Sequence, residues 1–168
     1  MAEYSFDLNV SESYPIGRYV YKTEDGLFWD IVKENVLTET LPTNATVMGT
    51  TIEKTAGENL VFGDVVYFKS DGKAWKASAN TAGTYPAMAM VTETILANAT
   101  GIFLLWGTVR NDAWNWTIGG ILYLSTTAGG VTQTPPNTTD NAIQILGVAH
   151  PNADTIFFKP SSDYITLL

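Results

Sequence analysis

Residues 112–164 decide the fold class and read DAWNWTIGGILYLSTTAGGVTQTPPNTTDNAIQILGVAHPNADTIFFKPSSDY. Short apolar runs of strand length alternate there with turns rich in Gly, Pro, Asn and Thr, and ionised side chains are rare. Many short strands separated by turn residues are typical of β-sandwiches and small β-barrels. The stretch therefore predicts an all-β fold of antiparallel strands, and its shortage of ionisable groups makes it poor material for a catalytic site.

Two hairpins are predicted outside this stretch, because the dipeptide Asp-Gly joins two alternating aromatic or β-branched runs in each of them. Asp25-Gly26 separates residues 16–22 from residues 27–32, and Asp71-Gly72 separates residues 63–69 from residues 73–77. The other predicted strands cover residues 46–53, 87–93, 101–110, 120–124, 143–149 and 155–159.

A helix is at most a minor part of the predicted fold. Residues 30–41 have an arguable helical pattern that Pro42 would end. The pattern favours a short helix and a non-helical segment equally. The remaining pattern fits a small β-sandwich or β-barrel with an extended N-terminal arm.

Composition limits the classes of function. The 168 residues suffice for one domain with a buried core. A net charge of −8 argues against a nucleic-acid partner, because binding to the phosphate backbone depends on Lys and Arg. The absence of Cys excludes disulfides, thiolate metal sites and Cys nucleophiles. The sequence has no recognisable signal peptide and no apolar run of membrane-spanning length, so we expect a soluble chain made in the cytoplasm, with no membrane partner.

Charge divides the chain near Glu58, since ten of the seventeen acidic residues lie in residues 1–58. We expect residues 1–58 to form an N-terminal arm and a hairpin that anchor the protein, and residues 59–168 to form the β-domain. An arm over residues 1–14 could add a strand to a neighbour's sheet, with Tyr4, Phe6 and Tyr14 as possible partner contacts. A frayed terminus or an ordinary first strand is the alternative.

No catalytic or metal-binding constellation stands out. His150, the only histidine, sits beside Pro151 and Asn152 in a predicted turn, where a surface hydrogen-bonding role is usual. A carboxylate-based hydrolase needs no His or Cys, but turn and sheet-edge roles explain each candidate acid. We expect no enzyme, no metal and no cofactor. The candidate acids are Glu53, Glu58, Asp64, Glu93, Asp112, Asp140 and Asp154.

Tryptophans form the remaining group of interest. Trp106, Trp114 and Trp116 surround one predicted strand, and an exposed indole could stack on a sugar ring. Packing in a core or at a subunit contact is the favoured interpretation, because aromatic residues are enriched in both. Arg110 is expected to pair with Asp112 or with a carboxylate of another copy.

Several motifs resemble a module found in virion proteins of tailed bacteriophages, among them head-decoration, head-fibre and tail-fibre proteins. The resemblance covers residues 51–164 and is most specific at DAWNW, residues 112–116, and LYLSTT, residues 122–127. Other matching segments are residues 51–60, 63–67, 76–77, 86–89, 119–120, 132–136, 144–149, 154–158 and 160–164. The first 50 residues match no motif.

The resemblance implies a virion structural protein. Because the chain is short and begins at Met1, we expect a decoration, cement or head-fibre-base protein on the outer surface of the head. It would bind the major capsid protein as a homo-oligomer, with a trimer favoured, and would stabilise the assembled shell by mass action. The alternative is a tail-fibre or receptor-binding module in which Trp114 or Trp116 recognises a host-surface glycan.

Overall fold

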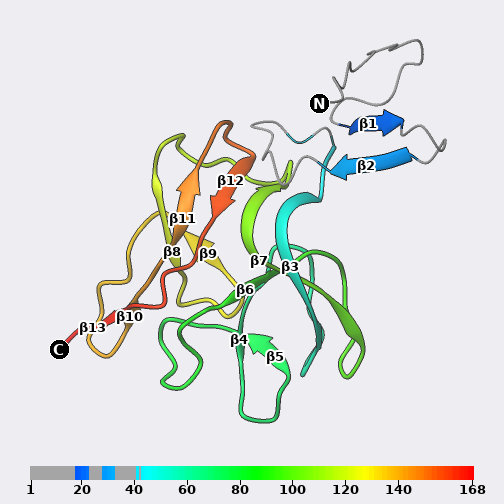
Figure 1. The fold of residues 1–168 in the computed structure, drawn as a ribbon. Helices are drawn as coiled ribbons and strands as arrows, with labels where there is room; N and C mark the ends of the chain where they lie inside the picture. Colours follow the sequence, from blue (N-terminus) through cyan, green and yellow to red (C-terminus); the bar gives the residue numbers. More distant parts are fainter. Residues whose placement is uncertain (1–17, 23–27, 33–40, 42) are drawn as a thin grey trace, which may run out of the picture. The chain divides into compact units, whose positions relative to one another are not determined.

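The protein is all-β throughout the part of the chain that the computed structural model describes, which is residues 18–22, 28–32, 41 and 43–168. These residues form strands joined by turns and contain no helix (Figure 1). The predicted fold class is confirmed. The chain divides into two compact units, Met1–Val36 and Leu37–Leu168.

The described part of the first unit is one antiparallel hairpin. Strand β1 (Arg18–Lys22) pairs with β2 (Phe28–Val32), as the sequence around Asp25-Gly26 predicts. The first three residues of the possible helix over residues 30–41 belong to β2, and residues 33–40 lie outside the described residues. The predicted arm over residues 1–14 also lies outside them.

The second unit is built around one curled antiparallel sheet with the strand order β5-β4-β6-β7-β12-β11-β8-β9, to which β3 adds by pairing with β7. A separate two-stranded pair, β10 with β13, lies near the C-terminus (Figure 1). The strands of this unit are β3 (Thr46–Thr55), β4 (Val65–Phe68), β5 (Ala74–Lys76), β6 (Ala89–Val91), β7 (Thr100–Arg110), β8 (Ile121–Leu124), β9 (Val131–Thr132), β10 (Ala142–Ile143), β11 (Ile145–Ala149), β12 (Thr155–Phe158) and β13 (Ile165–Thr166).

Strand β7 organises the sheet, because it has three partners. One edge pairs with β3 along the full length of that strand, and the other edge pairs first with β6 and then with β12. Strand β3 is therefore part of the main sheet. The boundary expected after residue 58 would assign β3 to the N-terminal region and its partner β7 to the β-domain, whereas both strands belong to the second compact unit.

Two apolar clusters lie on opposite faces of the sheet around β4, β6 and β7. Neighbouring residues alternate between them: Val65 and Leu104 belong to the larger cluster, and Val66 and Phe103 belong to the smaller one. Successive side chains of a strand point to opposite faces, so both faces are buried at this point. The larger cluster continues under β8, β11 and β12 with Leu122, Leu124, Leu146, Ile156 and Phe158.

One polar side chain in this core is fully satisfied. Gln144 is 0% exposed, and its Oε1 accepts a hydrogen bond from the Ala87 N–H at 2.8 Å. Its Nε2 donates to the carbonyl oxygens of Ala87 and Ser161. Gln144 thereby fastens two connecting segments to the start of β11.

Candidate interaction surface

The outer side of the sheet, opposite the larger cluster, is apolar and partly exposed over β7, β12, β11 and β8. We call it the outer face and define it by Trp106, Tyr123, Ile121, Ile145, Val148 and Phe157. Ile121, Ile145 and Trp106 are 46%, 45% and 40% exposed. Large apolar patches on a protein surface mark sites of interaction.

Strand register brings these side chains together. Phe157 lies opposite Val148, which in turn lies opposite Ile121, so the three form a row across β12, β11 and β8. Ile145 lies opposite Tyr123 in the next row. Paired residues project to the same face of a sheet and contact each other there, so the outer face is continuous across these strands.

A bulge brings Trp106 to the outer face. The register between β3 and β7 shifts between Thr50 and Thr51, which pair with Trp106 and Leu104, so that Leu105 is the extra residue on β7. Beyond the shift, Trp106 is paired with Thr50 and is exposed. A β-bulge re-aims the side chains that follow it, which explains why an indole within the longest strand is exposed to solvent.

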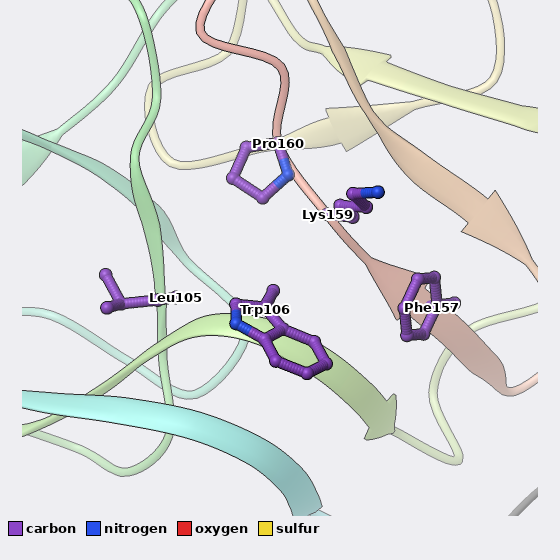
Figure 2. A pocket seen from close by; sticks show the side chains of 5 residues that line it. All are labelled: Leu105, Trp106, Phe157, Lys159 and Pro160. Carbon is purple, nitrogen blue, oxygen red and sulfur yellow. The ribbon is translucent and has the colours of Figure 1, made fainter. Parts of the chain in front are cut away.

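An open groove of about 410 Å³ lies at the point where β7 changes partner (Figure 2). Strand β6 ends its pairing with β7 at Leu104, and β12 begins its pairing at Gly107. The groove is lined by Leu105, Trp106, Phe157, Lys159 and Pro160. It therefore extends the outer face and adds one exposed ammonium group to it.

Trp114 and Trp116 lie elsewhere, packed against the larger cluster and half-buried. Their ring centroids are 5.9 Å apart and the ring planes are tilted by 52°. The expected packing in a core is confirmed for both, but they also line a hollow of about 290 Å³ that we call the Trp pocket. Other residues lining it are Phe62, Asp64, Gly129 and Val131. Trp106 is not part of this group.

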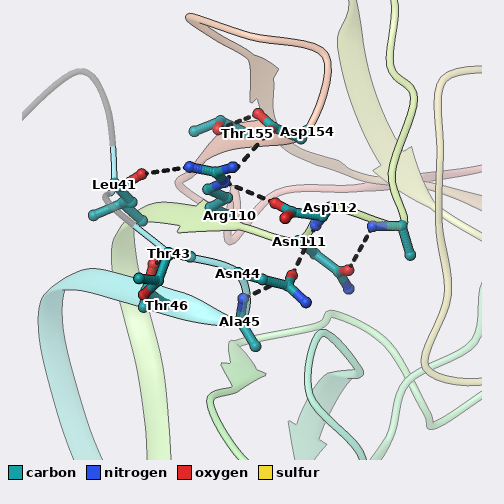
Figure 3. A network of polar contacts seen from close by, with 11 residues as sticks. Leu41, Thr43, Asn44, Ala45, Thr46, Arg110, Asn111, Asp112, Asp154 and Thr155 are labelled. Atoms are coloured by element: carbon teal, nitrogen blue, oxygen red, sulfur yellow. Dashed lines mark hydrogen bonds and ion pairs between the residues drawn. The ribbon is translucent and has the colours of Figure 1, made fainter.

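Arg110 has a structural role, as its position before Asp112 predicts (Figure 3). Its Nε donates to Asp112 Oδ1 at 2.8 Å and lies 3.2 Å from Asp154 Oδ2, while Nη1 donates to the Leu41 carbonyl. The hydrogen bond to Asp112 is the main reason why the pKa of Arg110 is raised. The side chain joins the end of β7 to the segments before β3 and before β12.

The candidate acids do not gather into one site: Asp112 and Asp154 share Arg110, and others bind backbone or hydroxyl groups. Glu58 accepts the Lys76 N–H at 2.9 Å, Glu93 accepts the Ile102 N–H, and Asp154 accepts the Thr155 hydroxyl. His150 is exposed in the turn between β11 and β12. Among the described residues no group of three or more His, Cys, Asp or Glu side chains could hold a metal ion.

The outer face was not anticipated from the sequence, although one signal was present. Strand β8 is apolar at every position, Ile-Leu-Tyr-Leu. When the side chains on one of its faces pack into the core, those on the opposite face are apolar too and point away from the core. Of the predicted contact residues, Trp114 and Trp116 come together in the Trp pocket. Tyr4, Phe6 and Tyr14 lie outside the described residues.

No family model matches the sequence, and no curated protein matches it either. Within the part of the chain that the structure describes, no helix has the length and hydropathy needed to cross a membrane.

Proposed function

We propose that this chain is a structural protein of a tailed-phage virion that binds the outside of the assembled head and stabilises it without catalysis. The observation that carries the proposal is the outer face, because an exposed apolar surface on a rigid sheet suits a permanent contact with another protein. The class of partner is proposed from the sequence motifs that resemble phage virion proteins. The major capsid protein is the partner that this proposal names.

The proposal is physically consistent with stabilisation of a shell. A protein that binds assembled capsid and not free subunits shifts the equilibrium toward the intact shell. A homo-oligomer, for which a trimer is favoured, would span several capsid subunits, so that modest individual contacts add up to tight attachment. Trp106 is the expected anchor residue, since large aromatic side chains dominate protein interfaces.

Binding to purified heads tests the role of the outer face. We expect Trp106→Ser to weaken co-sedimentation with heads of the phage that encodes the chain by about 10-fold or more, as for an interface hot spot. Leu96→Ser is the matched control, because Leu96 is 66% exposed and lies in the turn before β7, outside the outer face. Equal binding of the two variants would refute the assignment of this face.

Location on the virion tests the proposal as a whole. Gold-labelled antibody against the protein should decorate the heads of intact virions in electron micrographs. Label confined to the tail would overturn the proposal and favour the alternative, a receptor-binding module. Sedimentation of the isolated protein gives the oligomeric state independently of either outcome.

A further inference from the structure

The Trp pocket is a second site, distinct from the proposed capsid contact. It shares no residue with the outer face or with the groove beside Trp106. Its volume of about 290 Å³ is just below the usual range for ligand pockets, about 300–1,000 Å³. The pocket therefore fits a single small ring better than a segment of peptide.

Two indoles contribute to the apolar lining of this pocket, beside Phe62 and Val131. Trp114 rests against the backbone of Gly63, where a Cβ would lie 3.3 Å from Trp114 Cζ2. Trp116 is tilted by 52° to its neighbour, so the two rings form an angled wall and not a parallel stack. Such a wall offers an aromatic face to the C–H groups of a ligand ring.

A carboxylate supplies the main polar group. Asp64 Oδ2 accepts the Val61 N–H at 2.9 Å and lies 3.1 Å from Lys76 Nζ, which fixes the position of the carboxylate. Oδ1 lies against Gly129, where a Cβ would come within 2.6 Å of it. Glycine at this position therefore leaves Oδ1 room to accept hydrogen bonds, and Lys76 adds a donor beside it.

A further polar atom in the wall lacks a partner. Trp116 Nε1 is buried and has no hydrogen-bond acceptor among the described residues. An unpaired buried N–H costs about 1–3 kcal/mol. Because the nitrogen itself is buried, it is not counted among the groups that a ligand would contact. A ligand ring placed against the indoles would itself change the tryptophan fluorescence.

We propose that the Trp pocket binds one pyranose ring of a neutral sugar, free or at the end of a polysaccharide. A pyranose has an apolar C–H face for the indole and hydroxyl donors on its rim for Asp64, which matches both halves of the pocket. Lys76 balances the charge of Asp64 locally, so it is the chain's net charge of −8 that disfavours acidic sugars and nucleotides. This inference does not depend on the proposed attachment to capsid.

Titration of the full-length protein with methyl glycosides, followed by tryptophan fluorescence and NMR, tests the pocket. The probes are methyl glucoside, methyl galactoside and methyl N-acetylglucosaminide, with N-acetylneuraminic acid as the acidic comparison. We expect a Kd of about 1 mM for at least one neutral probe, in the range of few-contact ligands, and at least 10-fold weaker binding of the acidic sugar. Oligosaccharides that bind more tightly than the single ring would identify a polymer as the natural ligand.

Variants assign the binding to the pocket. Asp64→Asn keeps the size of the side chain and should weaken binding about 10-fold or more, since a charge-assisted hydrogen bond is lost. Trp114→Phe keeps an aromatic ring against the core and should weaken sugar binding less than Asp64→Asn does. Trp106→Phe on the outer face is the control and should leave the affinity for the sugar unchanged. Failure of every neutral probe at tens of millimolar, or unchanged affinity in Asp64→Asn, would overturn the proposal. Neither result bears on binding to heads.

Discussion

At the scale of single residues, burial decides how much a hydrogen-bonded side chain contributes to stability. The chain contains a matched pair, because Gln144 and Gln133 each use both amide atoms to bind backbone groups. Gln144 is fully buried, whereas Gln133, which binds the N–H and carbonyl of Thr117, is half-buried. If the glutamine is replaced by an apolar residue, water can bind the freed backbone groups more readily at Gln133 than at Gln144.

We therefore predict that Gln144→Leu lowers the free energy of unfolding by about 3–5 kcal/mol, because three backbone groups lose a partner at about 1–3 kcal/mol each with partial relaxation. Gln133→Leu should cost about 1 kcal/mol, the net value of exposed hydrogen bonds. Urea denaturation followed by circular dichroism measures both. Similar losses in the two variants would contradict the role of burial.

At the scale of elements, close backbone approach fixes the spacing between the paired strands β3 and β7. Gly49 and Gly107 lie opposite each other, and Gly107 has a φ of 148°. A Cβ at Gly107 would lie 2.1 Å from the Met48 carbonyl oxygen, and one at Gly49 would lie 2.1 Å from the Trp106 carbonyl oxygen. Backbone atoms cannot rotate away, so a side chain at either position would separate the two strands.

Gly107→Ala should accordingly destabilise the second unit by about 3 kcal/mol or more, as expected for overpacking combined with unfavourable φ. Gly83→Ala is the control, because Gly83 also has a positive φ of 84° but no atom within 4 Å of the added Cβ. Its cost should be about 1 kcal/mol, the strain of the backbone alone. Thermal unfolding measures the difference, and equal effects would show that the close contact between β3 and β7 at Gly107 is unimportant.

Sequence patterns predicted individual strands better than their arrangement. The hairpin of β4 and β5 was predictable because Asp-Gly and strict alternation act locally. Strands β9, β10 and β13 have two residues each, too few for a period to be visible. The central place of β7 depends on pairing across long sequence separations, which composition does not encode.

The candidate sites were predictable to different degrees for the same reason. Trp114 and Trp116 were singled out by residue type, and two neighbours on one turn lie close together wherever that turn folds. The exposure of Trp106 depends on the bulge opposite Thr50 and Thr51, and the run Phe-Leu-Leu-Trp, residues 103–106, does not reveal which side chain faces outward. Asp64 was considered as an acid, but its place beside Gly129 required the fold.

At the scale of the whole molecule, the described apolar core belongs to the second unit. Among the residues that the structure describes, all members of both apolar clusters lie between Val47 and Phe158. The polar network of Arg110 reaches back to Leu41 and no further among the described residues (Figure 3). The division of the chain between Val36 and Leu37 agrees with this distribution of contacts.

We predict that a protein beginning at residue 37 folds alone, with a melting temperature within about 4 °C of the full chain, the shift that corresponds to less than about 1 kcal/mol for a domain of this size. Near-ultraviolet circular dichroism, which reports the packed tryptophans, measures the transition. The same variant should lose attachment to heads if residues 1–14 contribute the anchor that the sequence suggests, while sugar binding at the Trp pocket should persist. A large fall in melting temperature would instead show that the first 36 residues complete the core, and the two compact units would then be one folding unit.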